Sequence, residues 1–370
     1  MKNKVCQVTC VHDRYDTRIF HKIAKSLNSG GFDSYILCVD DRGEECRDGV
    51  HFISVQYKPK NRINRILKSW KKLVKIALEI DADIYQLHDP ELLPLGKFLA
   101  KKNKIIIFDS HEDGRDIGMK GWIPKPFRKL VCRMYLLYEK NAIKKLAGCI
   151  SVDSNIVQRL SNYNGNCIQI TNFPFLPSQF NHNPNGYICY AGSPESYAQY
   201  EFLSALEVSG IPINYYLITN TSDKTLDRCK KLEIWKDIKT SNYVSFEELS
   251  KIYMNASLGM SIAYPDIGTD YWNGVFGVTK FFEFLAYGIP VICSSFDVWK
   301  KIIEKYDCGI CVNPYKIDEI SSALATLFSN RIRLMRMGEN ARRAAEKEFN
   351  WSTQETKLIC FYKMLLEQRS

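Results

Sequence analysis

The chain has 370 residues, of which 45% are hydrophobic and 25% charged, and its formal net charge is +10 at pH 7. This length and apolar content suffice for two domains, each with its own core. No apolar run approaches the ~18 residues that a spanning helix needs, which excludes an ordinary transmembrane protein. No signal peptide precedes the first strand-like run, so we expect a cytosolic protein.

Strand-like and helix-like segments alternate from the start of the chain, as in a doubly wound parallel sheet. The strand-like runs lie near residues 5–11, 34–39, 51–55, 84–87, 104–108, 149–152 and 167–171. A domain boundary is expected over residues 172–186. The segment NFPFLPSQFNHNPNG is rich in Pro and Asn, and its apolar residues follow neither the helical nor the strand periodicity. The sequence therefore predicts an α/β domain over residues 1–180.

The alternation resumes after this boundary. It predicts a second α/β domain over residues 187–350 and a last helix over residues 351–370. Ligands of open α/β sheets bind beyond the carboxyl ends of the strands. We therefore expect two Rossmann-like, doubly wound domains that face a central cleft.

Charge is distributed unevenly. Residues 1–186 contain 30 Lys and Arg against 19 Asp and Glu, a net +11, and residues 187–370 contain 21 against 22, a net −1. The densest basic segment, KPKNRINRILKSWKKLVKIALE, has apolar residues at helical spacing and predicts a helix with one apolar stripe and a basic face.

Two interpretations of this basic helix stay open. Its stripe can pack on the sheet with solvated lysines outside, or its basic face can rest on an anionic membrane. The membrane candidates are Lys68, Trp70, Lys71, Lys72 and Lys75. A second basic and aromatic stretch, from Trp122 to Arg133, is a candidate for the same surface.

The 13 cysteines are scattered through strand-like and helix-like segments, which favours reduced, buried thiols over a disulfide framework. Cys308 and Cys311 form a C-x-x-C pair, but no second pair stands at zinc-site spacing. The sequence therefore predicts no metal ligands.

The segment GVTKFFEFLAYGIPVICSS, residues 277–295, predicts a short, buried helix that ends at Gly288 and a strand that follows it. Lys280 and Glu283 then lie in the first turns of the helix, where unpaired N–H groups and the positive end of the dipole favour an anion. A phosphate can bind there beside Lys280, and Glu283 can accept hydrogen bonds from a sugar. The alternative is a plain salt bridge at i, i+3.

The pattern K-[FL]-[FL]-E-[FY]-[LM]-A-x-G-x-P-V resembles the donor-binding signature of GT-B glycosyltransferases, particularly the mostly retaining family four, which uses nucleotide sugars. Three further segments match in that family's order: DTRIFHKIAKSLNSGGFDSYIL from Asp16, DADIYQLHDPELLPLGKFLAKKNKIIIFDSHED from Asp81 and GENARRAAEKEFNWS from Gly338. The resemblance implies a GT-B fold whose last helix crosses back to the first domain.

The resemblance also implies roles on the donor side. It puts Lys280 near the diphosphate, Glu283 on the nucleotide ribose and His88 against the transferred sugar. The further donor-binding candidates are Thr279, Gly192, Ser193, Asp270 and Asn273.

On the acceptor side, polar residues follow three strands. His88 and Asp89 end one strand and His111 ends another, so these three are the catalytic candidates. Asp16 and Arg18 follow the first strand. We expect Arg18 to meet an anionic acceptor, and Asp16 either to join it or to cap the first helix.

The chain departs from the family at two places. Val275 stands eight residues before Glu283, where many members have a glutamate, and SPESYAQYE lacks the Arg and Lys that usually follow this strand. These departures leave open a non-catalytic scaffold subunit, and the same architecture also serves sugar-nucleotide epimerases. The basic helix favours a membrane-bound acceptor over an epimerase, and no base-stacking motif indicates nucleic acid.

We therefore predict a glycosyltransferase that moves a sugar from a nucleotide diphosphate sugar to a lipid-linked glycan in surface polysaccharide synthesis, with retained configuration. It is expected in the cytoplasm, peripheral on the inner face of the plasma membrane, with an anionic membrane surface as a partner. No cofactor or metal is expected, because a helix terminus and a lysine can neutralise the diphosphate.

Overall fold

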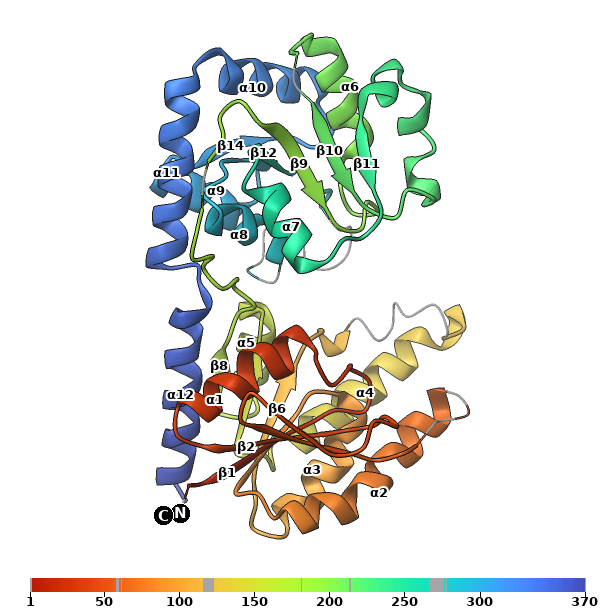
Figure 1. The fold of residues 1–370 in the computed structure, drawn as a ribbon. Coiled ribbons are helices and arrows are strands. Elements are labelled where there is room, and N and C mark those ends of the chain that lie inside the picture. Colours follow the sequence, from red (N-terminus) through yellow and green to blue (C-terminus); the bar gives the residue numbers. More distant parts are fainter. Residues whose placement is uncertain are drawn as a thin grey trace. The chain divides into compact units, whose positions relative to one another are not determined.

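The computed structural model of the chain describes residues 2–57, 60, 62–115, 123–180, 182–212, 214–265, 276 and 278–369. The chain divides into two compact units (Figure 1). The first unit comprises Met1–Asn172 and Gln354–Ser370, and the second comprises Phe173–Thr353. Nearly all of the expected boundary segment belongs to the second unit, because Phe173 already packs in that unit's core.

An eight-stranded sheet forms the first unit, in the order β3-β4-β2-β1-β5-β6-β7-β8, and it is parallel except between β3 and β4. Its strands are β1 Lys4–Val8, β2 Asp33–Cys38, β3 Glu45–Arg47, β4 Val50–Ser54, β5 Ile84–Leu87, β6 Ile105–Ser110, β7 Gly148–Ser151 and β8 Cys167–Gln169. The central strands β5, β6 and β7 are buried along their whole length, as expected of a covered parallel sheet. The strand order reverses at β1, so the loops after β1 and β5 diverge at a topological switch point.

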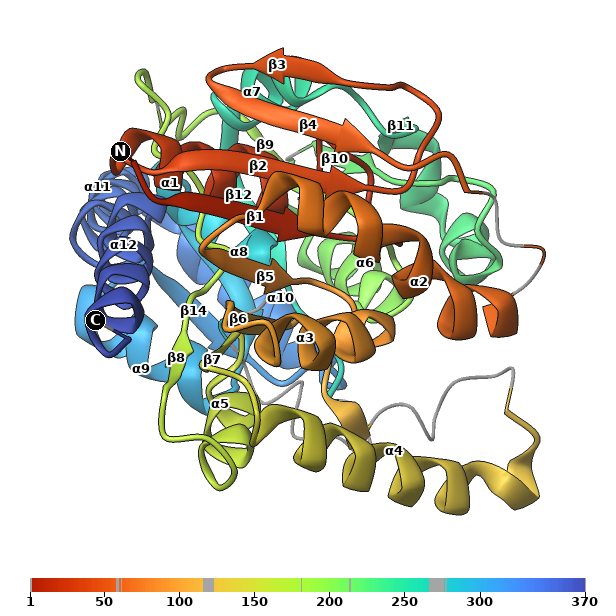
Figure 2. The same cartoon turned by 90° about the horizontal axis from the view of Figure 1, so that it is seen from below.

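Helices cover both faces of this sheet (Figure 2). One face carries α2 Arg62–Ile80, α3 Leu93–Ala100, α4 Arg128–Ile143 and α5 Ser154–Ser161. The other carries the π-helix η1 Thr17–Ala24, α1 Lys25–Ser29 and most of α12 Trp351–Glu367. The side chain of Ile359 on α12 lies against Gly30, and Tyr362 on α12 meets Phe32 edge to face at 5.8 Å between ring centroids.

The predicted basic helix is α2, and its apolar stripe faces inward. Leu73 and Ala77 are fully buried, and Trp70 packs against the same core. The side chains of Lys68, Lys71, Lys72 and Lys75 are exposed. Trp70 is thus half-buried against the core rather than exposed beside the lysines, and Leu78 on the same helix is 41% exposed; the membrane role of these residues stays a prediction. Among the described residues, no helix is both long and apolar enough to cross a membrane.

A six-stranded parallel sheet forms the second unit, in the order β11-β10-β9-β12-β13-β14. Its strands are β9 Tyr187–Ala191, β10 Tyr215–Ile218, β11 Lys239–Ser241, β12 Ala256–Ser261, β13 Val291–Ser294 and β14 Gly309–Val312. Its α-helices are α6 Gln199–Ser209, α7 Phe246–Tyr253, α8 Thr279–Ala286, α9 Asp297–Tyr306, α10 Ile317–Ser329 and α11 Arg331–Lys347. The order reverses at β9, so the switch point lies between the loops after β9 and β12.

Helix α8 packs close to this sheet because Gly259 on β12 has no side chain. A Cβ at Gly259 would lie 2.4 Å from the ring of Phe284, a fully buried residue of α8. The position of α8, and of the Lys280 and Glu283 side chains that it carries, therefore depends on this contact.

Replacing Gly259 by Ala should lower the free energy of unfolding by roughly 1–3 kcal/mol, because the added methyl group overpacks the sheet against α8. Urea unfolding measures the change. Gly165→Ala is the control, since a Cβ there meets open space, and it should alter stability by less than about 0.5 kcal/mol. Equal stability of the two variants would show that α8 adjusts freely.

Candidate functional site

One candidate site lies on the second unit, at the switch point of its sheet. Gly192 follows β9 with a φ of 139°, a conformation that favours glycine. The ammonium group of Lys280 reaches this glycine, since a Cβ at Gly192 would lie 2.3 Å from Lys280 Nζ. The structure therefore brings together two of the predicted donor positions, Gly192 and Lys280, with Ser193 and Thr279 exposed next to them in the chain.

Lys280 lies over two aromatic rings. Its Nζ is 4.6 Å from the ring centre of Tyr197 and 4.9 Å from that of Tyr190. Burial lowers the pKa of Lys280 to about 8, and the nearby charge of Glu283 offsets this only in part. Within the described part of the chain Lys280 forms no salt bridge, so the predicted alternative of a Lys280–Glu283 pair is not realised. A partly desolvated cation of this kind is suited to an anionic ligand.

Among the described residues, no side chain caps the start of α8. The side chain of Val278, at the N-cap, has no oxygen and forms no hydrogen bond to the helix, and the first turn contains no acidic residue. The first backbone N–H groups of a helix lack intrahelical acceptors, and the dipole adds partial positive charge there. The helix start, Gly192 and Lys280 together form an environment for a diphosphate.

Glu283 lies one turn further along α8. The hydroxyl of Tyr253, at the end of α7, donates a hydrogen bond to Glu283 Oε2 at 3.2 Å. Tyr253 is itself fixed, because its ring packs edge to face on Phe284 and Tyr287 at centroid distances of 5.3 and 5.2 Å. The carboxylate is thereby held in one orientation and remains half-buried, so it can accept further hydrogen bonds from a ligand.

The sequence reasoning missed the tyrosines of this site. Tyr190 and Tyr197 flank Gly192 in CYAGSPESY, and this repetition around a strand end was the available signal. The sequence gave no signal for Tyr253, because Tyr253 is 30 residues from its partner Glu283. The candidates Asp270 and Asn273, and the departure at Val275, lie outside the described residues.

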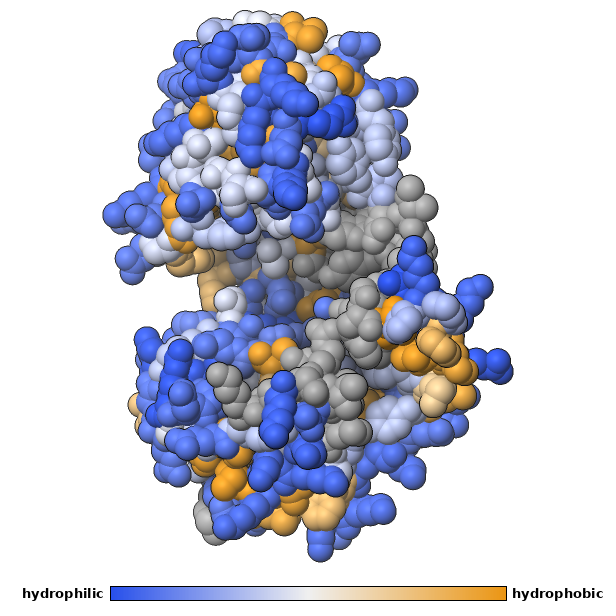
Figure 3. Space-filling model, turned by 90° about the vertical axis from the view of Figure 1, so that its right-hand side faces the viewer, coloured by the Kyte–Doolittle hydropathy of each residue, from blue (hydrophilic) through white to orange (hydrophobic). Residues whose placement is uncertain are grey.

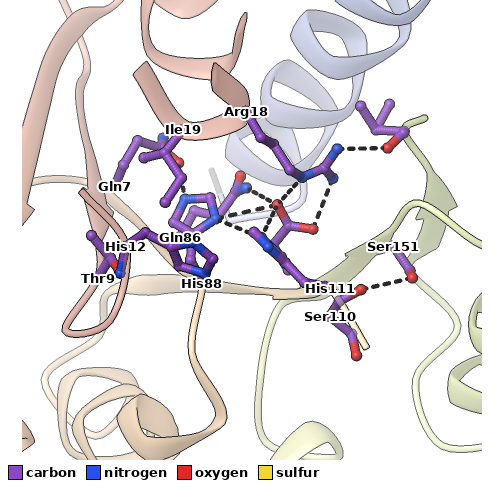
Figure 4. Close-up of polar contacts among 12 residues, drawn as sticks. Gln7, Thr9, His12, Arg18, Ile19, Gln86, His88, Ser110, His111 and Ser151 are labelled. Carbon is purple, nitrogen blue, oxygen red and sulfur yellow. Dashed lines mark hydrogen bonds and ion pairs between the residues drawn. The ribbon is translucent and has the colours of Figure 1, made fainter. Parts of the chain in front are cut away.

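A second cluster lies at the strand ends of the first unit, around the fully buried carboxylate of Asp109 on β6 (Figure 4). Arg18 binds both of its oxygens, from Nε at 2.9 Å and from Nη2 at 2.8 Å, and Gln86 Nε2 donates at 3.0 Å. Burial alone would raise the pKa of Asp109, but the Arg18 guanidinium and the neighbouring histidines hold it well below its usual range. Asp109 is therefore an anion.

Arg18 does not face a ligand. It is 4% exposed, and its Nη1 donates to the Ile170 carbonyl oxygen at 2.9 Å and to Asn172 Oδ1 at 3.0 Å. The expectation that Arg18 meets an anionic acceptor is therefore wrong, because all three of its nitrogens donate inside the unit. Asp16 caps η1 by accepting from the backbone N–H groups of Arg18 and Ile19 at 2.8 and 2.9 Å, as the capping alternative predicts.

A chain of hydrogen bonds determines how the amides beside Asp109 are oriented. A carboxylate only accepts, so Gln86 must turn its Nε2 towards Asp109. Its Oε1 is then free to accept from the hydroxyl of Tyr362 on α12. The oxygen of Tyr362 in turn accepts from Gln7 Nε2 at 3.1 Å. The Oε1 of Gln7 is therefore left as an acceptor.

This orientation assigns the histidine tautomers. Gln7 Oε1 lies 2.9 Å from His88 Nε2, which must donate to it. Burial lowers the pKa of His88 despite its contact with Asp109, so the ring is neutral and its Nδ1 carries the lone pair. That lone pair accepts from His111 Nε2 at 3.2 Å. In its neutral form His111 therefore has its lone pair on Nδ1, on a side chain that is 21% exposed.

The predicted catalytic residues thus differ in position. His88 is enclosed, with both ring nitrogens in hydrogen bonds, whereas the ring of His111 is partly exposed. Asp89 anchors the loop after β1, accepting from Thr9 Oγ1 at 2.9 Å and from the Cys10 N–H at 2.6 Å. The ring of His12, which the sequence reasoning missed, lies 4.9 Å from that of His111 at a tilt of 44°, and a hydrogen bond to Asp16 raises its pKa.

One group in the described part of the chain has the spacing of a metal site: ligand atoms of His88, Asp109 and His111 lie within 4.8 Å of one another. The carboxylate of Asp109 is already neutralised by Arg18, and the lone pair of His88 already accepts from His111. A divalent cation would have to break both contacts. The donor set therefore fits a hydrogen-bonded cluster better than a metal centre.

Comparisons with known proteins identify the second unit. Residues 206–344 match the family model of glycosyl transferases group 1, so this unit carries a domain of that group. A curated relative, the MMP alpha-(1->4)-mannosyltransferase of Mycolicibacterium hassiacum, is 27% identical over 81 residues. The match spans 22% of this chain and only 20% of the relative's length.

Solved structures resemble the chain over nearly its whole length. A sucrose-phosphate synthase from Thermosynechococcus elongatus has a TM-score of 0.72 at 14% identity, covering 99% of this chain and 100% of that one. Anabaena HepE in complex with UDP and glucose has 0.67 at 12%, covering 98% and 100%. WaaG, a glycosyltransferase involved in lipopolysaccharide biosynthesis, has 0.66 at 13%, covering 96% and 99%. The predicted GT-B fold and glycosyltransferase resemblance are confirmed, and membership of family four stays a prediction.

The histidine tautomers can be checked by nitrogen NMR. At mildly alkaline pH, His111 should show a protonated Nε2 and an unprotonated Nδ1. Tyr362→Phe removes the hydroxyl that links Gln86 to Gln7, so Gln7 loses its fixed orientation and a mixture of His111 tautomers should appear. In the control Tyr85→Phe, the lost hydroxyl bonds the Ala77 carbonyl elsewhere in the unit, and the shifts should stay unchanged. Unaltered His111 shifts in Tyr362→Phe would contradict the assignment.

The affinity for a nucleoside diphosphate should fall about ten-fold between pH 7 and pH 9. The ammonium form of Lys280 binds the diphosphate, and with a pKa of about 8 this form drops from about nine-tenths to about one-tenth of the population. Titration calorimetry with the tightest binder among UDP, GDP and dTDP measures the change. Lys280→Met should bind weakly at both pH values, and an equally steep dependence in that variant would assign the titration to another group.

Proposed function

We propose that the protein is a glycosyltransferase that binds a nucleotide diphosphate sugar on its second unit and transfers the sugar to a glycan acceptor. The observation that carries this proposal is the Lys280 ammonium against Gly192 at the start of α8. The group 1 domain and the likeness to a protein solved with UDP and glucose support it.

The donor site can stabilise the leaving group. As the bond to the sugar breaks, negative charge grows on the diphosphate, and Lys280 and the N–H groups of α8 lie where that charge develops. Glu283, oriented by Tyr253, accepts hydrogen bonds from the ribose hydroxyls. We propose that no metal is needed, since these groups supply positive charge themselves.

The first unit supplies the acceptor side. The Nδ1 lone pair of His111 can accept a hydrogen bond from a sugar hydroxyl, and the anionic Asp109 stabilises any proton that the ring takes up. His88 is a positioning residue here, because it fixes the tautomer of His111. The proposed reaction retains the anomeric configuration, as the family resemblance implies.

The proposed acceptor is a lipid-linked glycan in surface polysaccharide synthesis, at the inner face of the plasma membrane. The net charge of +11 in residues 1–186 and the outward lysines of α2 support an anionic membrane as partner. The likeness to WaaG, involved in lipopolysaccharide biosynthesis, supports this class of product.

A thermal-shift screen against UDP, GDP and dTDP, with and without EDTA, tests the proposal. A bound ligand at ~100 times its Kd should stabilise the protein by about 2.7 kcal/mol, and EDTA should change nothing. Glu283→Ala should weaken binding by roughly 1.5–3 kcal/mol, because a charge-assisted hydrogen bond is lost.

Glu247→Ala is the matched control, since Glu247 is an exposed carboxylate on α7 of the same unit. It should bind as the wild type does. If none of the three nucleotides stabilises the protein, the result favours the non-catalytic scaffold. If EDTA abolishes nucleotide binding, the result contradicts the metal-independent site.

A further inference from the structure

Helix α4 leaves a row of large apolar side chains exposed. Phe127, at the end of the 3-10 turn η4 (Lys125–Phe127), is 57% exposed, and Leu130, Met134 and Leu137 on α4 are 57%, 61% and 53% exposed. Their spacing of three and four residues puts all four on one face of the helix. We call these four residues the α4 stripe.

The α4 stripe is separate from the face that α4 buries. Ala142 and Ile143 are fully buried in the core of the first unit, and Tyr138 packs against the same core. Lys97 of α3 covers the Tyr138 ring at 5.2 Å. Against the described residues of the unit, more than half of each stripe side chain stays uncovered, although burying it would be favourable.

The charges beside the α4 stripe all have one sign. Four basic residues accompany it: Lys125, Arg128, Lys129 and Arg133. No acidic residue occurs between Ile123 and Tyr138. Figure 3 shows the result as orange residues bordered by blue ones at the right-hand edge of the first unit.

We propose that the α4 stripe inserts into the interface of an anionic lipid bilayer, with its basic border on the headgroups. An apolar face bordered by basic side chains is the pattern of helices that lie in such an interface. The sequence reasoning placed the main membrane contact on α2 and offered the stretch from Trp122 to Arg133 as a second candidate, but Leu73 and Ala77 in the apolar stripe of α2 are buried. On the described part of α2, Leu73 and Ala77 are buried and Leu78 alone among the large apolar side chains is exposed, whereas α4 and the turn before it expose four large apolar residues beside basic ones.

A second copy of the chain fits this surface less well. Two α4 stripes packed on each other in a symmetric dimer would bring their basic borders together, and like charges in contact oppose association. Anionic headgroups instead complement both the apolar residues and the border. The charge pattern therefore favours lipid.

Helices α2, α3 and α4 follow one another along the same face of the sheet, and Figures 1 and 2 agree that the N-terminal halves of α2 and α4 project on the same side of the unit. The exposed lysines of α2 can thus add long-range attraction to the same bilayer. The inference rests on the membrane association in the proposed function, but it does not depend on sugar transfer.

Co-sedimentation with vesicles tests the inference. The full-length wild type should sediment with vesicles of equal parts phosphatidylcholine and phosphatidylglycerol, and part of this binding should survive 1 M salt, where the Debye length is only about 3 Å. Leu130→Gln/Met134→Gln should reduce the partition coefficient about ten-fold or more and remove the salt-resistant part, because two apolar side chains leave the lipid. Glutamine keeps helix propensity.

The matched control is Ile332→Gln/Met335→Gln on α11, which alters two exposed apolar residues, 81% and 46% exposed, that also have arginine neighbours. It should bind vesicles as the wild type does. Unchanged thermal unfolding and nucleotide response in both variants show that the fold is intact. Wild-type vesicle binding by the α4 variant would overturn the inference, as would equal loss in the α11 variant.

Two further outcomes separate the alternatives. If the wild type binds no vesicles, both the insertion and the proposed membrane association fail, while the thermal-shift response still decides the donor site on its own. If sedimentation without lipid shows self-association that the α4 variant abolishes, the stripe belongs to an interface between two copies, and the lipid assignment is wrong.

Discussion

The strand ends of the first unit are organised around one buried negative charge. Asp109 has no exposed surface, and an uncompensated carboxylate in such a place would be strongly unfavourable. Arg18 compensates it from η1, Gln86 binds it from the neighbouring strand, and the hydroxyl of Tyr362 on α12 donates to Gln86. Three segments far apart in the chain are therefore connected to this carboxylate by hydrogen bonds. The same network of hydrogen bonds determines the tautomer of His111.

The second unit contains a positive charge, the ammonium group of Lys280, which aromatic rings rather than an ion pair surround. Lys280 rests on two tyrosine rings, and burial lowers its pKa to about 8. Cation–π contacts are weak beside a salt bridge in a desolvated place, so a phosphate can replace them at small cost. The charge of Asp109 is thus compensated within the protein, whereas Lys280 has no ion-pair partner among the described residues, which suits the role in ligand binding proposed for it.

The two basic helices show how one sequence pattern leads to two surfaces. Both α2 and α4 combine apolar residues at helical spacing with a run of basic residues. Leu73 and Ala77 in the stripe of α2 are covered by the core, and the residues from Phe127 to Leu137 that form the α4 stripe are more than half exposed. Periodicity identifies a face of a helix, but only the neighbouring elements decide whether that face is buried.

The sequence by itself determined the α/β class, the helix that carries Lys280 and Glu283, and the strand ends that carry His88 and His111, because these depend on periodicity and on motifs within a few residues. The tertiary structure alone decided what the side chains touch. It turned Arg18 inward to Asp109, 91 residues away, and brought Tyr253 to Glu283 across 30 residues. Such contacts depend on how strands and helices are ordered in space, and the local sequence around each residue carries no record of that order.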